Sequence, residues 1–250
     1  MKTDAVIFDI DGTLTNSIRP IIASWNRHLS SLEYPHVLLD QDLAASLMGK
    51  TMDDWAKAML PSVDLSVSRG ITETMEQLEN EEIRKNGTDL YPHVKETFER
   101  LSKEYELFIL SNCGKGYIEA VMAYAEIEPC VKGHLCFGDN GLDKPDNLKK
   151  MIEEYHLSHP VYVGDTARDK ECCDIAGIPF IFVSWGFGDV PDALYRADSM
   201  KELPDVIPLV ERWYKDQTVW PSRPCRFYSV CRVLQTTEKP HRSAVDRIDA

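Results

Sequence analysis

Short apolar runs recur along the chain, separated by longer stretches with helical periodicity. An apolar run in which polar residues do not alternate indicates a strand that is buried on both faces. Such runs, which together predict five buried strands, are AVIF (5–8), LFIL (107–110), HLCF (134–137), VYVG (161–164) and FIFV (180–183).

Helical segments are expected between the later strands, near 93–103, 115–125, 145–156 and 167–176. Strands that alternate with helices of this length are typical of proteins with a parallel sheet covered by helices. The sequence therefore predicts an α/β fold built on a doubly wound parallel sheet.

The stretch between residues 15 and 90 has helical periodicity and little strand character. Its last part, about 64–86, is acidic and amphipathic, and Gly49, Pro61 and Gly70 interrupt the stretch. These features predict about four helices, separated at the interrupting residues. Because the stretch is too long to be a simple crossover between two strands, we expect an inserted helical cap.

The predicted organisation is a core made of 1–14 and 91–215, with the cap at 15–90. From Asp216 onward the chain loses clear periodicity and carries six Lys/Arg against four Asp/Glu. This basic composition, which includes Pro and Ser, predicts a peripheral or disordered tail over 216–250.

Composition and charge limit the number of domains, the kinds of partner and the cellular location that we expect. At 250 residues the chain can hold one α/β domain and a modest second module. The formal net charge of -13 argues against nucleic acid and anionic membranes as partners. No stretch reaches the ~20 apolar residues of a membrane span, and no signal-peptide pattern is recognised. Seven cysteines, an odd number without a Cys-x-x-Cys pair, predict a reducing, cytoplasmic location.

Polar residues able to do chemistry lie at or near the ends of three predicted strands. In an open parallel sheet, ligands bind beyond the carboxyl ends of the strands. Each residue alone has an ordinary structural explanation, as part of a turn, a helix cap or an exposed surface. Their shared position at strand ends instead predicts one site at one edge of the sheet. The residues are Asp9, Asp11, Ser111, Asn112, Asp165 and Asp169. Lys144 lies between them in the sequence, in GLDKPDN just before a Pro-started helix, and is expected to converge on the same edge.

This combination of carboxylates, a hydroxyl and an ammonium suits phosphoryl transfer. Asp9 can act as a nucleophile that accepts a phosphoryl group, which splits hydrolysis into two steps. Asp11 can protonate the leaving alkoxide and later deprotonate water. Clustered carboxylates need a divalent cation, and hard oxygen ligands suit Mg²⁺. Lys144 and the Ser111 hydroxyl would stabilise charge on the phosphoryl oxygens.

Over about residues 4 to 210 the chain resembles the haloacid dehalogenase superfamily, in its Mg²⁺-dependent phosphatase branch. The resemblance rests on four motifs in order, FDIDGTLT, LSN, LDKP and GDTARD. It implies a Rossmann-like core in which Asp9 is both the nucleophile and a metal ligand. It also implies that Asp11 is the general acid/base and lends its backbone carbonyl to the metal.

The same resemblance implies roles for residues of the later motifs and for the cap. Asp165 would complete the protein ligands of Mg²⁺, and Asp169 would support the metal shell or Lys144. The helical insertion resembles a cap that closes over the site and selects the substrate. The phrases YPHVKETFERL (91–101) and SWGFG (184–188) are most similar to phosphoglycolate phosphatases and their close relatives.

Three side chains are candidates for contacts with the substrate. Asn112 follows the motif-two serine, Lys50 lies in a Gly-containing break between predicted helices, and Arg19 lies close behind motif one. Lys50 and Arg19 would meet an anionic group, or they are an ordinary exposed lysine and a surface arginine on the first cap helix. Trp25 and Met52 are expected to pack in the core of the cap.

The expected function is hydrolysis of a small-molecule phosphate monoester by a monomer or homodimer. A dehalogenase attacks carbon and needs no acid two residues after the nucleophile, so Asp11 argues against that reaction. A phosphosugar mutase or another phosphotransferase keeps both aspartates and remains an alternative. A receiver-type phospho-accepting module would lack the large helical insertion, and a silent scaffold would not need the intact motifs. The identity of the phosphate ester is left open.

Overall fold

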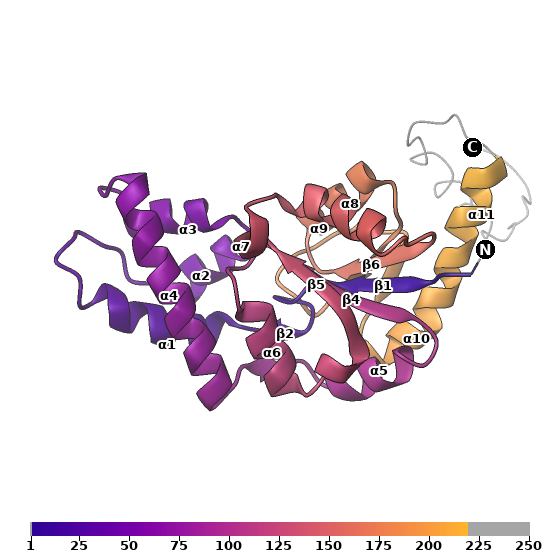
Figure 1. The fold of residues 1–250 in the computed structure, drawn as a ribbon, viewed down its shortest axis with the longest axis horizontal. Helices are drawn as coiled ribbons and strands as arrows, with labels where there is room; N and C mark the ends of the chain where they lie inside the picture. The colour runs from indigo at the N-terminus through magenta and orange to yellow at the C-terminus, as the bar shows by residue number, and fades with distance from the viewer. Residues whose placement is uncertain (1, 220–250) are drawn as a thin grey trace, which may run out of the picture. The chain divides into compact units, whose positions relative to one another are not determined.

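The centre of the structure is a six-stranded parallel sheet with the order β5-β4-β1-β6-β7-β8. The computed structural model describes residues 2–219 of the chain. The first strand lies in the middle of the sheet, between β4 and β6, so the residues that follow it lie at the centre of the sheet edge (Figure 1). The strands are β1 (Ala5–Phe8), β4 (Glu106–Ser111), β5 (Val131–Cys136), β6 (Pro160–Gly164), β7 (Phe180–Val183) and β8 (Tyr195–Ala197).

All five predicted strands are present, and the main differences from the prediction lie at the two edges of the sheet. The edge strand β5 begins at Val131 and ends at Cys136, whereas its apolar run predicted 134–137. Its first half reads Val-Lys-Gly and is only partly buried, so it lacks the continuous apolar signal of an inner strand. The opposite edge strand, β8, was not predicted because its three residues are too short to show a pattern.

Helices cover both faces of the sheet, as the doubly wound prediction requires. Alternate residues of β1 point to opposite faces, since Val6 and Phe8 belong to one buried cluster and Ala5 and Ile7 to another. The first cluster includes residues of α5, α6 and α10, and the second includes residues of α8 and α9. The helices of this part are α5 (Val94–Leu101), α6 (Tyr117–Ala125), α7 (Phe137–Asn140), α8 (Lys144–Glu154), α9 (Ala167–Ala176), α10 (Leu203–Val206) and α11 (Glu211–Val219).

Between β1 and β4 the chain forms a helical segment, as predicted. A two-stranded antiparallel ribbon, β2 with β3, precedes and follows the helices of this segment. One predicted break is wrong, because Gly70 lies inside the longest helix rather than at its end. A glycine inside a helix costs ~1 kcal/mol, which the packing of a long helix can offset. The elements are β2 (Thr15–Asn16), α1 (Ile18–Leu29), α2 (Gln41–Leu47), α3 (Met52–Met59), α4 (Leu65–Asn86) and β3 (Asp89–Leu90).

The helical segment has a hydrophobic cluster of its own. The rings of Trp25 and Trp55 pack edge-to-face with centroids 5.0 Å apart, and Met52 packs against the same cluster. Trp25 and Met52 therefore lie in this core, as expected. Up to Tyr214 the chain forms one compact unit, and its division into a core and a cap at the stated boundaries stays a prediction.

The compact unit ends at Tyr214, close to the predicted start of the tail at Asp216, and that boundary stays a prediction. Helix α11 continues to Val219, so helical backbone extends past Asp216, where the sequence pattern becomes unclear. Before that point, the Tyr214 hydroxyl donates to the carbonyl of Pro160 and its ring packs edge-to-face with His159. The remainder of the predicted tail, 220–250, lies outside the described residues.

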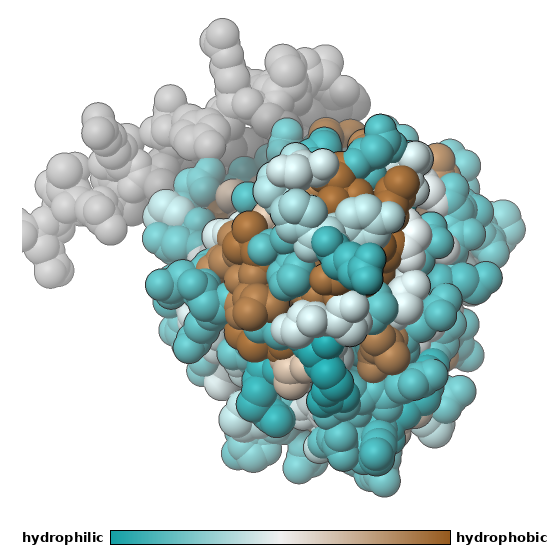
Figure 2. Space-filling view, turned by 90° about the vertical axis from the view of Figure 1, so that its left-hand side faces the viewer, coloured by the Kyte–Doolittle hydropathy of each residue, from teal (hydrophilic) through white to brown (hydrophobic). Residues whose placement is uncertain are grey.

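Exposed apolar residues are present on the helical segment. Figure 2 views the molecule from the side of this segment and shows hydrophobic patches interspersed with hydrophilic side chains. Within residues 2–219, no helix is both long and apolar enough to cross a membrane. The exposed apolar side chains of the segment are Tyr34, Val37, Leu38, Val67 and Leu78.

Candidate active site

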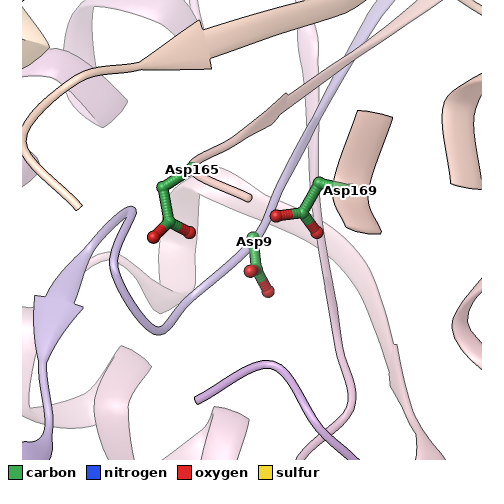
Figure 3. A group of neighbouring side chains, drawn as sticks. All are labelled: Asp9, Asp165 and Asp169. Atoms are coloured by element: carbon green, nitrogen blue, oxygen red, sulfur yellow. The ribbon is translucent and has the colours of Figure 1, made fainter. Parts of the chain in front are cut away.

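The fold brings the predicted strand-end residues together at one edge of the sheet. Asp9 directly follows β1, Ser111 is the last residue of β4, and Asp165 directly follows β6. The carboxylates of Asp9, Asp165 and Asp169 are shown in Figure 3, where Asp9 lies between the other two. One oxygen of each lies within 4.8 Å of the others. Parallel strands end at the same edge, which explains why residues distant in sequence meet here.

Lys144 is buried among these carboxylates. Its Nζ lies 3.0 Å from Asp9 Oδ1 and donates to Asp169 Oδ1 at 2.6 Å. Burial alone would lower the pKa of this ammonium, but the carboxylates of Asp169 and Asp9 raise it well above its usual value. Burial raises the pKa of Asp9, and the Lys144 charge opposes that rise. Lys144 is therefore held as a cation beside the Asp9 carboxylate.

Asp169 connects Lys144 to the first turn of α9. Its Oδ2 accepts hydrogen bonds from the backbone N–H of Thr166 at 3.0 Å and from the Thr166 hydroxyl at 2.6 Å. The Thr166 hydroxyl oxygen in turn accepts from the Asp169 N–H, which completes a capping box. Since its other oxygen accepts from Lys144, Asp169 fixes the position of the ammonium relative to the sheet.

Asp165 has an oxygen without a hydrogen-bond partner. Its Oδ2 accepts from the backbone N–H of Phe187 at 2.7 Å, whereas the buried Oδ1 has none among the described residues. A Cβ at Gly12 would lie 2.1 Å from Asp165 Oδ2, and one at Gly186 would lie 2.3 Å from Asp165 Cβ. Only glycine fits at these two places. Burial raises the pKa of Asp165 to about 7.

These observations fit a bound divalent cation. Three buried carboxylates face one buried ammonium, so negative groups are in excess at the sheet edge. Asp165, which contributes an oxygen to this group, also has a buried oxygen without a hydrogen-bond partner among the described residues. Hard oxygen donors of this kind are the ligands that Mg²⁺ prefers. The site can therefore hold a metal, and the residues agree with the type of ion expected from the sequence.

The second aspartate of motif one is held away from this cluster by two hydroxyl groups. Asp11 Oδ1 accepts hydrogen bonds from Ser17 Oγ and from Tyr117 Oη, each at 2.5 Å. Burial raises the pKa of Asp11 above its usual value. The sequence reasoning missed both donors, because a serine at a helix start and a tyrosine on a later helix carry no signal that joins them to Asp11.

The three predicted substrate contacts differ in position. Asn112 Nδ2 donates to the backbone carbonyl of Gly49 at 3.2 Å, which connects the motif-two loop to the helical segment. Lys50, next to Gly49, is exposed and lines the cavity above the sheet edge. Arg19 does not reach that cavity, because its exposed guanidinium pairs with Asp89.

A cavity lies between the sheet edge and the helical segment. Its sheet-edge wall includes Asp9, Asp11, Ser111, Asn112 and Lys144. The helical segment contributes apolar and aromatic residues together with three polar residues of α4. The residues of the helical segment that line it are Ile21, Trp25, Met48, Gly49, Lys50, Met52, Trp55, Glu76, Glu79 and Asn80.

The polar residues of α4 were also missed by sequence reasoning. Glu79 and Asn80 are buried and Glu76 is half-buried, although an acidic amphipathic helix is expected to turn its carboxylates to solvent. The sequence does contain a signal for the burial of Glu79, because Glu79 is four residues after the buried Met75 and four before the buried Ile83. It therefore shares a helix face with apolar core residues.

Comparisons with known proteins agree with this fold and indicate the family. A family model described as haloacid dehalogenase-like hydrolase matches residues 6–183. The phosphoglycolate phosphatase of Rhodobacter capsulatus is 26% identical over 216 residues, which cover 84% of this chain and 97% of that protein. The phosphoglycolate phosphatase of Synechococcus elongatus is 26% identical over 195 residues, covering 74% of this chain and 85% of that protein.

Solved structures share the fold. A protein from Haemophilus somnus, described as a predicted phosphoglycolate phosphatase, superposes with a TM-score of 0.69 at 21% identity, covering 82% of this chain and 98% of that chain. The family model extends from β1 to the end of β7 and so includes every sheet-edge residue described above. The chain therefore belongs to the haloacid dehalogenase-like hydrolases, and it is an enzyme of their phosphatase branch.

Proposed function

We propose that this enzyme is a Mg²⁺-dependent phosphatase that hydrolyses a small-molecule phosphate monoester through an aspartyl phosphate on Asp9. The observation that carries the proposal is the buried arrangement of Asp9 between the Lys144 ammonium and the Asp165 carboxylate with its unpartnered oxygen. Burying several charged groups costs free energy unless they pair with one another or with a bound cation.

In the first step, a carboxylate oxygen of Asp9 forms a bond to phosphorus while the bond from phosphorus to the leaving oxygen breaks. The electron pair of the broken bond stays on the leaving oxygen, which takes a proton from Asp11. The raised pKa of Asp11 favours the protonated form that this step needs. Ser17 and Tyr117 both bind Oδ1 of Asp11 and thereby orient the carboxyl group.

In the second step, a water molecule attacks phosphorus of the aspartyl phosphate and gives its proton to Asp11. The bond between phosphorus and the Asp9 oxygen breaks, inorganic phosphate leaves, and Asp11 is protonated again. One residue thus serves as acid and then as base, and the cycle closes without another reactant.

The residues that would hold Mg²⁺ are Asp9, Asp165 and the backbone carbonyl of Asp11. The ion, when bound, would neutralise charge on the carboxylates and on the transferring phosphoryl group. Asp169 would act outside this set, since both of its oxygens already accept hydrogen bonds from Lys144 or Thr166.

Several side chains would bind the phosphoryl oxygens. Lys144 is a buried cation next to Asp9, and the hydroxyl of Ser111 lies in the same cavity. Asn112 would position the motif-two loop through Gly49, and Lys50 would add an exposed cation on the cavity wall. The helices of 15–90 would act as the cap that closes over the substrate. Arg19 is not included, because its guanidinium is paired with Asp89 away from the cavity.

The direct test is turnover of phosphate esters by the full-length protein with and without metal. We expect hydrolysis of p-nitrophenyl phosphate in Mg²⁺, its loss in a chelator and its return when Mg²⁺ is added in excess. Calorimetric titration with Mg²⁺ should show binding to the wild type and much weaker binding to Asp165→Asn. Hydrolysis that continues unchanged in chelator, or no hydrolysis of any ester in a broad panel, would contradict the proposal.

A further inference from the structure

Helix α4 presents a group of hydrogen-bond acceptors to the cavity. Glu79 Oε2 accepts from Trp25 Nε1 at 2.9 Å, and no described residue donates to its other oxygen. Neither oxygen of Glu76 has a hydrogen bond or an ion pair among the described residues, although the side chain is half-buried. We call Glu76, Glu79 and Asn80 the α4 wall.

Asn80 gives the second, independent observation. It is 5% exposed and lines the same cavity. Its Nδ2 donates to the carbonyl of Lys115 at 2.9 Å, which fixes the orientation of the amide. Its Oδ1 is then left buried without a partner among the described residues. A buried acceptor in this state is costly unless a donor reaches it.

No cation among the described residues forms an ion pair with the α4 wall. Of the two lysines that line the cavity, Lys144 pairs with Asp9 and Asp169, and Lys50 is exposed. Burial raises the pKa of Glu79 well above its usual value and that of Glu76 to about 7. The free polar atoms of this wall therefore need donors or positive charge from outside residues 2–219.

The aromatic residues beside the wall suit the same kind of ligand. Trp25, which donates to Glu79, and Trp55 both line the cavity. The faces of tryptophan rings attract ammonium groups and also pack against C–H groups of polyols. A carboxylate gains nothing from these faces, and on the α4 wall it would meet the Asn80 carbonyl oxygen and two carboxyl groups without a paired cation among the described residues.

We infer that the α4 wall binds the leaving group of the substrate, and that this group carries hydrogen-bond donors, as hydroxyl or ammonium, rather than a carboxylate. The inference rests on the proposed function, which places the phosphoryl end of the substrate at Asp9. Both ends of the substrate then lie in one cavity, because Asp9 and the α4 wall line the same space. The substrate would differ from phosphoglycolate, on which the relatives named above act.

A matched series of two-carbon phosphate esters tests this directly. The series is 2-hydroxyethyl phosphate, 2-aminoethyl phosphate and 2-phosphoglycolate, which differ only in the group opposite the phosphate. We expect kcat/KM in Mg²⁺ to be at least ~10-fold higher for the better of the first two than for 2-phosphoglycolate, since a site built of acceptors rejects a group without donors. The first two esters distinguish hydroxyl from ammonium.

Variants of the wall locate the effect. Glu76→Gln and Glu79→Gln keep the size of the side chain and remove its charge, and each should lower kcat/KM for the preferred two-carbon ester more than for p-nitrophenyl phosphate. Glu81→Gln is the matched control, because Glu81 lies on the same helix but is exposed and does not line the cavity. Because Glu79 is buried, its substitution can destabilise the fold, so the thermal midpoint of each variant is measured. If Glu79→Gln unfolds, Glu76→Gln alone is compared with Glu81→Gln.

The outcomes separate the two proposals. Hydrolysis of p-nitrophenyl phosphate together with a preference for 2-phosphoglycolate would overturn this inference and leave the proposed function intact. A preference for 2-phosphoglycolate that grows at low pH would do the same, since protonated glutamic acids would then be binding the carboxylate. Absence of Mg²⁺-dependent hydrolysis of every ester would overturn both. Equal losses in Glu76→Gln and Glu81→Gln would also overturn the inference.

Discussion

The cavity has two acidic walls that differ in how their charges are compensated. At the sheet edge, Asp9 and Asp169 share the buried ammonium of Lys144, and one oxygen of Asp165 lacks a partner. On helix α4, Glu76 and Glu79 face the same cavity without any ion pair among the described residues. We propose that the first wall binds a cation and a phosphoryl group, whereas no described cation pairs with the carboxyl groups of the second.

The difference indicates that the sheet-edge wall serves phosphoryl transfer, whereas the α4 wall serves substrate selection. A wall that combines carboxylates with an ammonium, and with the metal ion that we propose, can stabilise charge as it moves during phosphoryl transfer. A wall of acceptors with no compensating cation contributes instead through what it binds and what it excludes. Changes at the sheet edge should therefore affect every substrate, whereas changes on α4 should affect substrates according to their leaving groups.

The largest expected effect comes from the nucleophile. Asp9→Asn should lower kcat by ~10⁴-fold or more for every ester, because the amide is a poor nucleophile and a poor metal ligand. Lys144 keeps its pairing with Asp169 in this variant, so the fold should persist. Turnover and thermal midpoint are measured together, and near-normal turnover by the purified variant would show that Asp9 is not the nucleophile.

The next effect separates the acid from the nucleophile. Asp11→Asn should slow hydrolysis of alkyl phosphates by the ~10²–10⁴-fold typical of general acid/base catalysis. The loss should be smaller for aryl phosphates, whose leaving oxygens need less protonation. Steady-state rates for one alkyl and one aryl ester provide the comparison. Equal losses for the two would argue against Asp11 as the acid.

A smaller effect concerns stability on the α4 wall. Burial raises the pKa of Glu76 from its usual value of 4.5 to about 7 in the folded protein, because burial disfavours the ionised form. The folded state therefore binds a proton more tightly, and stability is lost as pH rises from 4.5 through about 7. Glu76→Gln should remove this loss and raise the free energy of unfolding above pH 7 by about 1–3 kcal/mol.

Urea unfolding of the wild type and of Glu76→Gln at pH 5 and pH 8 measures that effect. The stability difference between the two proteins should be larger at pH 8. The exposed Glu81→Gln serves as the control, with little change at either pH. A Glu76→Gln protein that is less stable than the wild type at pH 8 would show that the carboxylate has a compensating partner.

The smallest effect is expected from shortening the chain after Val219, because every residue of both walls lies before Tyr214. Turnover and preference among esters should stay unchanged. A chain ended after Arg212 is the matched comparison, since it also removes the Tyr214 ring that packs on His159 and the hydroxyl that binds Pro160. Its thermal midpoint should fall. Loss of turnover in a folded 1–219 protein would place part of the site beyond Val219.

The sequence predicts the first wall far better than the second, for a physical reason. Asp9, Ser111 and Asp165 follow continuous apolar strands, and the ends of parallel strands meet at one edge whatever the details of packing. Tyr117 meets Asp11 through the packing of α6 beside motif one, and Ser17 meets it through the turn that leads into α1, and no local sequence pattern records either contact. The strand β8 is not predicted from the sequence, because three residues at an edge are too few to show a periodic pattern.

Helix α4 shows how a correct local prediction can hide a site. Its amphipathic, acidic pattern correctly predicted a helix, and the same pattern suggested that its carboxylates are solvated. Glu79 lies on the same face of the helix as the buried Met75 and Ile83, so its position in the sequence argues against a solvated carboxylate. Only the structure shows that a cavity lies against this face. Gly70 is a similar case, because a residue that usually marks a helix end lies within a helix held by its packing.

The most direct measurement of the central claim is the location of the phosphoryl group on the enzyme. Asp11→Asn, which should form the intermediate from an aryl phosphate but hydrolyse it slowly, is mixed with that ester and Mg²⁺ and quenched. Borohydride then reduces the acyl phosphate, and peptide mass spectrometry identifies the reduced residue. The account predicts homoserine in place of Asp9 and an unchanged Asp165. Reduction at another residue, or none during active turnover, would contradict it.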